Sequence, residues 1–411
     1  MSATATTAIQ VSLDLASGRR SVGRLALRDQ RVYFEYSPEF LDSGLELSPL
    51  RLPLRPGLLT FDPRLFDGLP GLFNDSLPDG WGRLLFDRAR RARGLLPGEA
   101  TPLDRLAHVG SGGMGALVYE PDLGPDAPDA PIDLDRLADQ SRAVLEGDAE
   151  GVLDALIALN GSSAGARPKA MIAFDPRTGG LAHGQAGLPD GHEPWLVKFA
   201  TQQDGADAGA IEQVYALMAR SAGLAMTPTR LLRTARGGAY FATRRFDRDG
   251  DARRHVHTVS GLLHSDHRIP ALDYEDLVVL TLGLTRDIRE VEAMVRLAAF
   301  NVLAHNRDDH AKNIAFLMTD DGRWRLAPAY DLTFSSGPGG EQSTTIMGQG
   351  RAPGTEALRA LGKAARLSPR RVEALIEQTR DALAAWPRLA TEHGVSAAQI
   401  RLIGDRLDAI R

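Results

Sequence analysis

No cysteine occurs among the 411 residues of this chain, which excludes disulfides, zinc–thiolate sites and cysteine nucleophiles. The chain also lacks an apolar run long enough to span a bilayer, so we expect no membrane attachment. Its net charge is −5 and it has no basic tail, which argues against tight binding to nucleic acid except through a partner. The first residues lack the basic and apolar segments of a secretory signal, and we therefore expect a cytoplasmic protein.

The remaining composition is typical of a soluble globular protein, with 43% hydrophobic and 25% charged residues. A chain of this length exceeds a single core, so two or three domains are expected. Alternating apolar and polar residues predict a β-rich unit over 8–60, and residues 72–87 predict a turn that leads into a helix. Asp79 is a candidate N-cap of that helix. The segment 121–131 is rich in proline, aspartate and glycine and is the clearest linker.

Two glycine-containing segments have the composition of phosphate-binding loops. The segment Gly110–Leu117 is interpreted as a structural turn that closes the first domain, because a lone glycine cluster is a weak signal. The run Asn160–Lys169 consists of small residues with a lysine at its end, and its backbone N–H groups can wrap phosphates. It lacks the P-loop pattern, however, so taken alone it indicates only a loop.

Beyond the linker, the hydrophobic pattern predicts an ordered series of strands and helices. The predicted strands cover 170–174, 195–199, 229–233 and 239–243, and the predicted helices cover 133–160, 210–223, 273–284, 287–304, 355–365 and 368–386. After residue 248 the chain is expected to be helical, apart from one polar segment and the hairpin that follows it.

That polar segment, His305–Asn313, is dense in catalytic side-chain types. Asp308 and Asn313 are separated by four residues, which is the Asp-x4-Asn spacing of a kinase catalytic loop. Asp331 follows 18 residues after Asn313, just past a short hairpin. Phosphoryl transfer requires a carboxylate that accepts the proton of the attacking hydroxyl, and oxygen ligands for magnesium. Asp308 fits the first role, and Asn313 and Asp331 fit the second.

Two other interpretations of this segment remain open on its residues alone. It can be a solvated polar loop after a buried helix. It can also be a transition-metal site, with His305, Asp308, Asp309 and His310 as ligands. The order of the surrounding elements favours the kinase. A strand lysine, Lys198, precedes a helix that carries Glu212, and the lobes then meet near residues 244–248.

The chain resembles the HipA-type serine/threonine kinases, the toxins of bacterial toxin–antitoxin pairs. The resemblance covers nearly the whole sequence. It rests on Phe73–Asp79, Gly110–Leu117, Ser162–Lys169, Arg245–Arg248, Asp308–Asn313 and Leu326–Asp331. It implies an α+β, bilobal protein-kinase-like fold of the phosphatidylinositol-kinase type, with a small β-rich N-terminal subdomain and a helical C-lobe. The expected parts are a HipA N-terminal subdomain (1–120), a linker (121–131), a kinase N-lobe (132–247) and a helical C-lobe (248–411).

The same resemblance implies a set of site residues and two cofactors, ATP and Mg²⁺. Asp308 is the expected catalytic aspartate, and Asn313 and Asp331 are the expected magnesium ligands. The expected ATP contacts are Ala164, Gly165, Lys169, Lys198, Arg245, Phe246, Asp247, His310, Lys312 and Tyr330. Ser162 matches the serine that these kinases phosphorylate on themselves, and Ser163 is the alternative. A phosphate there adds about two negative charges to a loop that is meant to hold ATP phosphates, so the modification is expected to inactivate the enzyme.

The family also implies partners. The expected antitoxin is a HipB-like helix-turn-helix protein on a separate chain, through which the toxin reaches DNA. The expected substrate is a translation protein, in particular an aminoacyl-tRNA synthetase. Two alternative functions remain at this stage: a catalytically weak module that binds an antitoxin repressor at DNA, and a small-molecule or lipid kinase with the same site chemistry.

Overall fold

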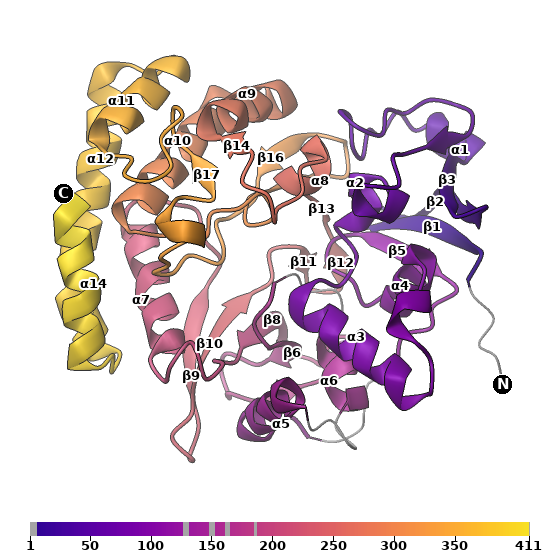
Figure 1. The fold of residues 1–411 in the computed structure, drawn as a ribbon, viewed down its shortest axis with the longest axis horizontal. Coiled ribbons are helices and arrows are strands. Elements are labelled where there is room, and N and C mark those ends of the chain that lie inside the picture. The colour runs from indigo at the N-terminus through magenta and orange to yellow at the C-terminus, as the bar shows by residue number, and fades with distance from the viewer. Residues whose placement is uncertain (1–5, 126–130, 148–152, 161–164, 185–186, 411) are drawn as a thin grey trace.

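The computed structural model describes the chain except for residues 1–5, 126–130, 148–152, 161–164, 185–186 and 411. Figure 1 shows a β-rich N-terminal unit at one end of the molecule and a group of helices at the other, with a second sheet between them. Part of the predicted linker 121–131 therefore falls outside the described residues.

The N-terminal unit is built on an antiparallel sheet with the order β4-β3-β2-β1-β5. Its strands are β1 (Ala8–Leu15), β2 (Gly18–Arg28), β3 (Arg31–Tyr36), β4 (Leu59–Thr60) and β5 (Leu117–Glu120). Alternation in β1 places Ile9, Val11 and Leu13 in the core, where they meet Phe34 and Phe73. This burial explains why the period of two in the sequence predicts the strand correctly.

The helices of this unit lie between β3 and β5 in the sequence. They are α1 (Pro38–Leu41), η1 (Phe66–Gly68), α2 (Gly71–Asn74), α3 (Gly80–Ala92), η2 (Pro97–Glu99) and α4 (Pro102–Val109). The longest of them, α3, packs Trp81 and Leu85 against Trp195 and Val197 of the second sheet. Its apolar face therefore belongs to the core of the predicted N-lobe rather than to that of the N-terminal sheet.

The second sheet is antiparallel, with the order β7-β6-β8-β10-β9. Its strands are β6 (Lys169–Phe174), β7 (Leu181–Ala182), β8 (Glu193–Lys198), β9 (Thr229–Arg233) and β10 (Ala239–Arg244). The helices α5 (Leu134–Glu146) and α6 (Leu153–Asn160) lie beside it in Figure 1 and share its core. The helix α7 (Ala208–Ser221) connects β8 to β9.

The helix α7 is anchored to the C-terminal helices as well as to the sheet. Its residues Val214, Tyr215 and Met218 are fully buried in the large core that α10 and α12 also form. The Tyr215 hydroxyl donates a hydrogen bond of 2.7 Å to the carbonyl oxygen of Ala304, at the end of α10. The predicted boundaries at residues 120, 131 and 247 stay predictions, and both α3 and α7 pack across them.

The C-terminal part contains more strands than the sequence pattern predicted. Its helices are α8 (Val259–Leu263), α9 (Tyr274–Thr285), α10 (Ile288–Leu303), α11 (Thr355–Ala364), α12 (Pro369–Ala384), α13 (Trp386–Glu392) and α14 (Ala397–Ile410), with η3 (Pro338–Gly340). Its strands are β11 (Arg248–Asp249), β12 (Ala252–Arg253), β13 (His255–Thr258), β14 (Leu272–Asp273), β15 (Ala315–Met318), β16 (Trp324–Leu326) and β17 (Thr344–Thr345). The expectation of a nearly all-helical region after residue 248 is therefore wrong.

The physical reason lies in β13. This strand extends the β15–β16 hairpin into a three-stranded sheet, yet its two buried positions are occupied by His255 and His257. Histidines are not read as apolar positions, so the alternation does not stand out in the sequence. Among the helices that the structure describes, none is long and apolar enough to cross a membrane.

Candidate active site

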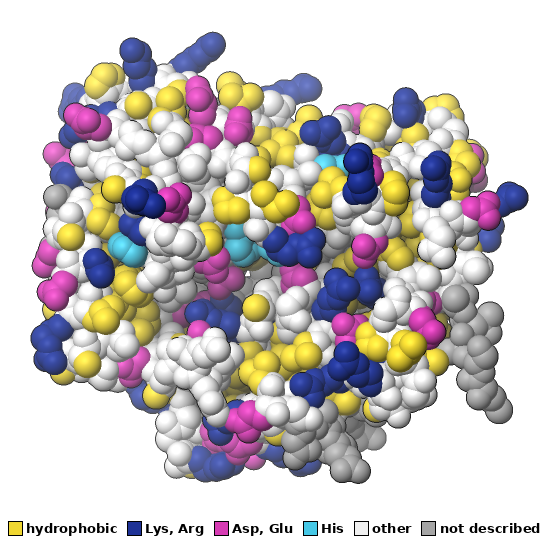
Figure 2. Space-filling model, in the orientation of Figure 1, with side chains coloured by type: hydrophobic (Ala, Val, Ile, Leu, Met, Phe, Trp, Pro, Cys, Tyr) yellow, Lys and Arg dark blue, Asp and Glu magenta, His cyan; other side chains and the backbone are white. Residues whose placement is uncertain are grey.

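A cavity of about 440 Å³ opens between the second sheet, α7, the segment after α10 and the N-terminal unit. Figure 2 shows a hollow near the middle of the molecule with acidic, basic and histidine side chains gathered around it. Most of the predicted site residues line this cavity, namely Gly165, Lys169, Lys198, Arg245, Phe246, Asp308, His310, Lys312, Asn313, Tyr330 and Asp331. Residues predicted from five separate stretches of sequence thus surround one space.

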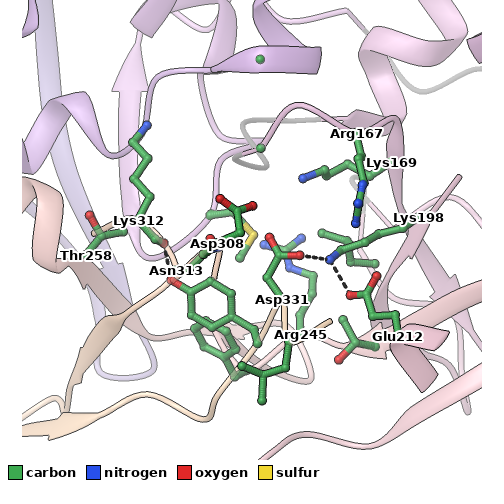
Figure 3. Close-up of a pocket in the computed structure, with 18 of the residues that line it drawn as sticks. Arg167, Lys169, Lys198, Glu212, Arg245, Thr258, Asp308, Lys312, Asn313 and Asp331 are labelled. Atoms are coloured by element: carbon green, nitrogen blue, oxygen red, sulfur yellow. Dashed lines mark hydrogen bonds and ion pairs between the residues drawn. The ribbon is translucent and has the colours of Figure 1, made fainter. Parts of the chain in front are cut away.

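Lys198 stands at the centre of the charged network (Figure 3). It ends β8, and its ammonium Nζ lies 2.5 Å from Glu212 Oε1 of α7 and also hydrogen bonds to Asp331 Oδ1. Burial lowers the pKa of Lys198, but Asp331 and Glu212 outweigh it, so the net shift is upward. Burial raises the pKa of Glu212 above its ordinary value. The strand lysine and the helix glutamate, which follow each other in the predicted order of elements, therefore form an ion pair.

Asp331 has a φ of +57°, a left-handed conformation that aspartate tolerates better than most residues. This turn directs the carboxylate toward the ammonium of Lys198 (Figure 3). Burial opposes its ionisation, yet the charges of Lys198 and Lys169 hold the pKa of Asp331 well below its usual range. Asp331 therefore carries a negative charge in the wall of the cavity at neutral pH.

Asp308 and Asn313 lie in the short segment between α10 and β15. The Asn313 Nδ2 group donates a 2.7 Å hydrogen bond to the carbonyl oxygen of Asp308, so each residue fixes the other. The Asp308 side chain is 57% exposed and lines the cavity. Desolvation within the cavity, followed by the charge of Asp331, raises the pKa of Asp308.

The neighbouring Asp309 points the other way and is 1% exposed. It accepts hydrogen bonds from the Tyr274 hydroxyl at 3.0 Å, the Gln342 amide at 3.1 Å and the Thr344 backbone N–H at 3.1 Å. Burial raises the pKa of Asp309 to about 6. This buried carboxyl anchors the segment, which leaves Asp308 as the aspartate at the cavity.

The start of β6 places cationic groups on the opposite wall. Lys169 is buried, and desolvation lowers its pKa to about 8. A Cβ atom on Gly165 would lie 2.6 Å from Lys169 Nζ, and the φ of Gly165 is +106°, so glycine is required there. Arg167, whose guanidinium lies 2.9 Å from Asp204 Oδ1, also lines the cavity. We did not predict Arg167 as a site residue, although it lies inside the Ser162–Lys169 motif.

An apolar end of the cavity lies beside the connection between the two lobes. Leu196, Met226, Phe241 and Leu332 line it together with Phe246, whose ring centroid lies 5.4 Å from that of Tyr330. These apolar and aromatic side chains are of the kind that hold an aromatic base.

Asp247 is the predicted contact that the structure places elsewhere. Its side chain is fully buried and does not line the cavity. It accepts hydrogen bonds from Arg245 at 2.7 Å, Arg248 at 2.6 Å and the Gly115 N–H at 2.8 Å. The two arginines, opposing the effect of burial, hold its pKa far below the usual range. Asp247 therefore joins the N-terminal unit to the lobe connection, and Arg245 and Phe246 carry the contact with the cavity.

Three predicted residues, Ala164, Ser162 and Ser163, lie outside the described residues. The proposed phosphorylation site therefore stays a prediction.

The N-terminal unit contributes residues that sequence reasoning did not assign to the site. Asp75, Ser76, Asp79, Gly80 and Met114 all line the cavity. Four of these lie in or directly after the run Phe73–Asp79, and Met114 lies in Gly110–Leu117. Both segments were already noted as features of the family's N-terminal domain. That signal located the residues but did not reveal that they reach the site.

The transition-metal interpretation is not supported by the geometry. His305 stacks on Phe334 with ring centroids 5.1 Å apart and bonds to the Ser335 carbonyl, and Asp309 points into the core. Within the described part of the chain, no three histidine, aspartate or glutamate side chains are grouped to hold a metal ion.

Comparison with known proteins agrees with this arrangement. A model of the HipA-like C-terminal domain matches residues 161–386, and a model of the HipA N-terminal domain matches residues 13–120. The chain belongs to the HipA family. No curated protein sequence matches it.

Among solved structures, the chain is similar to one from the Shewanella oneidensis MR-1 toxin–antitoxin system, a complex of HipA, HipB and operator DNA. The identity is 17% and the TM-score 0.68, with 98% of this chain and 96% of that chain covered. Helicobacter pylori proinflammatory kinase CtkA matches at 13% identity and a TM-score of 0.32, over 54% of this chain and 90% of its own. The family models and the first match confirm the predicted α+β, bilobal kinase-like fold of a HipA protein.

Proposed function

We propose that this HipA-family protein is an ATP- and Mg²⁺-dependent serine/threonine protein kinase that acts as the toxin of a toxin–antitoxin pair. One observation carries the proposal: the Lys198–Glu212 ion pair, Asp331, Asn313 and Asp308 all meet at a single cavity. Kinases need a phosphate-pairing lysine, oxygen ligands for magnesium and a carboxylate near the acceptor hydroxyl, and this cavity supplies each type of group.

The residues present fit the two cofactors. The Asp331 carboxylate and the Asn313 side-chain oxygen are hard ligands, and magnesium is commonly held by one or two such groups plus phosphate oxygens. The Asn313 Nδ2 group is engaged by the Asp308 carbonyl, so the amide oxygen is the atom left to face a metal. Lys169, Lys198 and Arg167 match the phosphates in charge, and the apolar end beside Phe246 matches an adenine.

Asp308 then orients the acceptor serine or threonine hydroxyl and accepts its proton. Bound ATP supplies the phosphoryl group that this hydroxyl attacks. The raised pKa of Asp308 makes its carboxylate a stronger base than that of an ordinary aspartate. Lys198, held in place by Glu212, offsets the negative charge of the phosphates.

The proposed partners follow from the family. The Shewanella protein is described in a complex with HipB and operator DNA. We therefore assign this chain a HipB-like helix-turn-helix antitoxin on a separate polypeptide, through which it reaches DNA. The proposed substrate is a translation protein of the aminoacyl-tRNA synthetase class. Self-phosphorylation at Ser162, with Ser163 as the alternative, is the proposed means of inactivation.

Mass spectrometry of the purified protein before and after incubation with Mg-ATP tests the proposal. We expect one added phosphate on Ser162, which supports both kinase activity and self-inactivation. A phosphate on Ser163 supports kinase activity as well, but assigns the inactivating modification to Ser163. The Asp308→Asn variant serves as the control and should gain no phosphate. If the protein gains no phosphate and does not bind Mg-ATP in calorimetry, the kinase proposal is wrong. Phosphate transfer only to lipids or small molecules would show that the protein is a lipid or small-molecule kinase and not a protein kinase.

A further inference from the structure

Asp79 of the N-terminal unit reaches into the cavity from the start of α3. It occupies the N-cap position that the sequence predicted, but its side chain makes no hydrogen bond to its own helix. Its Oδ1 atom accepts a 2.5 Å hydrogen bond from the backbone N–H of Gly165, and its Oδ2 atom lies 2.7 Å from Lys312 Nζ. One carboxylate therefore bridges the start of the Gly165–Lys169 stretch and the segment that carries Asp308.

The residues after Asp79 hold Gly165 a second time. The Trp81 N–H donates a 3.1 Å hydrogen bond to the Gly165 carbonyl oxygen. Gly80 has a φ of +42°, and a Cβ atom there would lie 2.6 Å from Ala166 Cα and from the Gly165 oxygen. Only glycine allows this approach. The turn 79–81 thus satisfies both backbone groups of Gly165.

Burial and charge make the bridge energetically significant. The side chains of Asp79 and Lys312 are 20% and 6% exposed, and a buried ammonium without a partner is strongly unfavourable. Burial opposes the ionisation of Asp79, yet Lys312 and the hydrogen bond from Gly165 hold its pKa below the ordinary value. Figure 3 shows the Lys312 side chain extending away from Asp308, toward the N-terminal unit. The position of Lys312 in the cavity therefore depends on the other domain.

We propose that Asp79 is a positioning residue of the ATP site: it fixes Lys312 and the backbone at Gly165, so that Lys312 and the cations that follow Gly165, Arg167 and Lys169, are placed to contact the ATP phosphates. This inference rests on the proposed kinase function. It makes the N-terminal unit a part of the nucleotide site, so that the site is complete only when both domains are in contact. Because Asp79 acts through Lys312 and Gly165, its removal should affect the binding of ATP more than the transfer step.

The test compares Asp79→Asn with Asp62→Asn in the full-length protein. Asp62 is a matched control, because it is also a carboxylate of the N-terminal unit paired with a cation, Arg64 at 2.6 Å, but on the surface. We expect Asp79→Asn to raise both the Kd and the KM for Mg-ATP about tenfold, with kcat within about threefold of the wild type, the size expected for one charge-assisted hydrogen bond. Asp62→Asn should change neither. Unchanged or tighter ATP binding by Asp79→Asn would overturn the inference.

A double-mutant cycle covers the case in which Asp79→Asn folds poorly because Lys312 is left unpaired. Asp79→Asn combined with Lys312→Met removes both charges, and its affinity for ATP should match that of Lys312→Met alone within about twofold. If the two effects multiply, the residues act independently and the inference fails. If the wild type binds and transfers phosphate normally while Asp79→Asn matches it, only the inference fails. A wild type that neither binds ATP nor transfers phosphate overturns the proposed function together with the inference.

Discussion

Two of the junctions between the N-terminal unit and the rest of the molecule use an aspartate, a glycine N–H group and a cation. At the first, Asp79 of the N-terminal unit accepts from the Gly165 N–H and pairs with Lys312. At the second, the direction is reversed: Asp247 near the lobe connection accepts from the Gly115 N–H of the N-terminal unit and pairs with two arginines. The chemistry is the same, but the first junction borders the cavity, whereas the second is buried away from it.

The difference in burial separates a functional role from a structural one. The Asp247 side chain is 0% exposed and satisfied entirely by protein, so its charge can act only on the fold. The Asp79 side chain is 20% exposed and lines the cavity, so a change in its charge reaches whatever binds there. The same contrast exists between neighbours in the sequence, since Asp308 faces the cavity and Asp309 the core.

A third polar contact between the domains shows that distances alone do not identify an active site, because the residues must also be accessible to a substrate. The Ser48 hydroxyl lies 2.9 Å from His257 Nε2, and His257 Nδ1 lies 2.6 Å from Asp75 Oδ2. These distances match a Ser-His-Asp hydrolase triad. Ser48 and His257 are 0% exposed, however, so no substrate can reach the serine. The arrangement therefore fixes β13 to the N-terminal unit.

The largest expected effect is that of removing the cavity carboxylate Asp308. Asp308→Asn should lower phosphate transfer about 10³-fold, because the acceptor hydroxyl loses the group that orients it and takes its proton. The melting temperature should stay within about 2 °C of the wild type, since the side chain is 57% exposed. Transfer assays with radiolabelled ATP and thermal unfolding measure the two quantities. Wild-type transfer by this variant would contradict the assignment of the catalytic aspartate.

Removing the buried carboxylate of Asp247 should lower the stability of the fold, in contrast to the loss of activity expected for Asp308. Asp247→Asn leaves Arg245 and Arg248 buried without a full counter-charge, and we expect a loss of about 3 kcal/mol in the free energy of unfolding, measured in urea. Asp249→Asn is a matched control, because its side chain is 63% exposed and pairs with Arg254 at 2.6 Å. That control should change stability by less than about 0.5 kcal/mol. Equal effects of the two variants would show that burial does not distinguish these aspartates.

The burial of Asp309 should make the free energy of unfolding depend on pH. Its pKa is raised to about 6 in the folded protein, against about 3.9 in an unfolded chain, so the native state binds the proton more tightly. The corresponding stabilisation is fully present below about pH 4 and is lost as the pH rises through 6. The difference in unfolding free energy between the wild type and Asp309→Asn should therefore fall by on the order of 2 kcal/mol from pH 4 to pH 7. A difference that does not vary with pH would exclude this assignment.

The sequence predicted those parts of the site that depend on local spacing. Asp308, Asn313 and Asp331 lie in one motif and its hairpin, and Lys198 and Glu212 lie on a strand and the next helix. Their meeting follows from the order of elements in a kinase-like fold. The assignment of Asp308 over Asp309 also came from spacing, and the structure places them accordingly.

The sequence did not predict the contacts that cross between domains. Asp79 had the features of an ordinary N-cap, because the residues after it predict a helix. Its partners Gly165 and Lys312 are 86 and 233 residues away, so nothing near Asp79 in the sequence indicates them. Asp247 adjoins residues that line the cavity, but its partner Gly115 lies in a glycine-rich turn that had been interpreted as a local feature. Such pairs depend on how the two domains pack, and no local period or spacing encodes that packing.

The pH dependence of transfer should separate Asp308 from the buried carboxylates, although the effect is small. Only the ionised carboxylate can accept a proton, so kcat/KM should fall as the pH decreases through the pKa of Asp308. Because desolvation raises that pKa, the fall should begin at a higher pH than an ordinary aspartate would give.

A substitution at His310 sharpens this test. His310 Nε2 lies 3.9 Å from Asp308 Oδ1, and the electrostatic interaction with His310 lowers the pKa of Asp308. His310→Gln removes that interaction, so the acidic limb of the kcat/KM profile should move to higher pH. His267→Gln is the comparison variant, because His267 also lines the cavity and lies beside His310, with ring centroids 5.3 Å apart, but burial lowers its pKa to about 4, so it contributes little charge. If both variants keep the wild-type midpoint, the acidic limb belongs to a group other than Asp308.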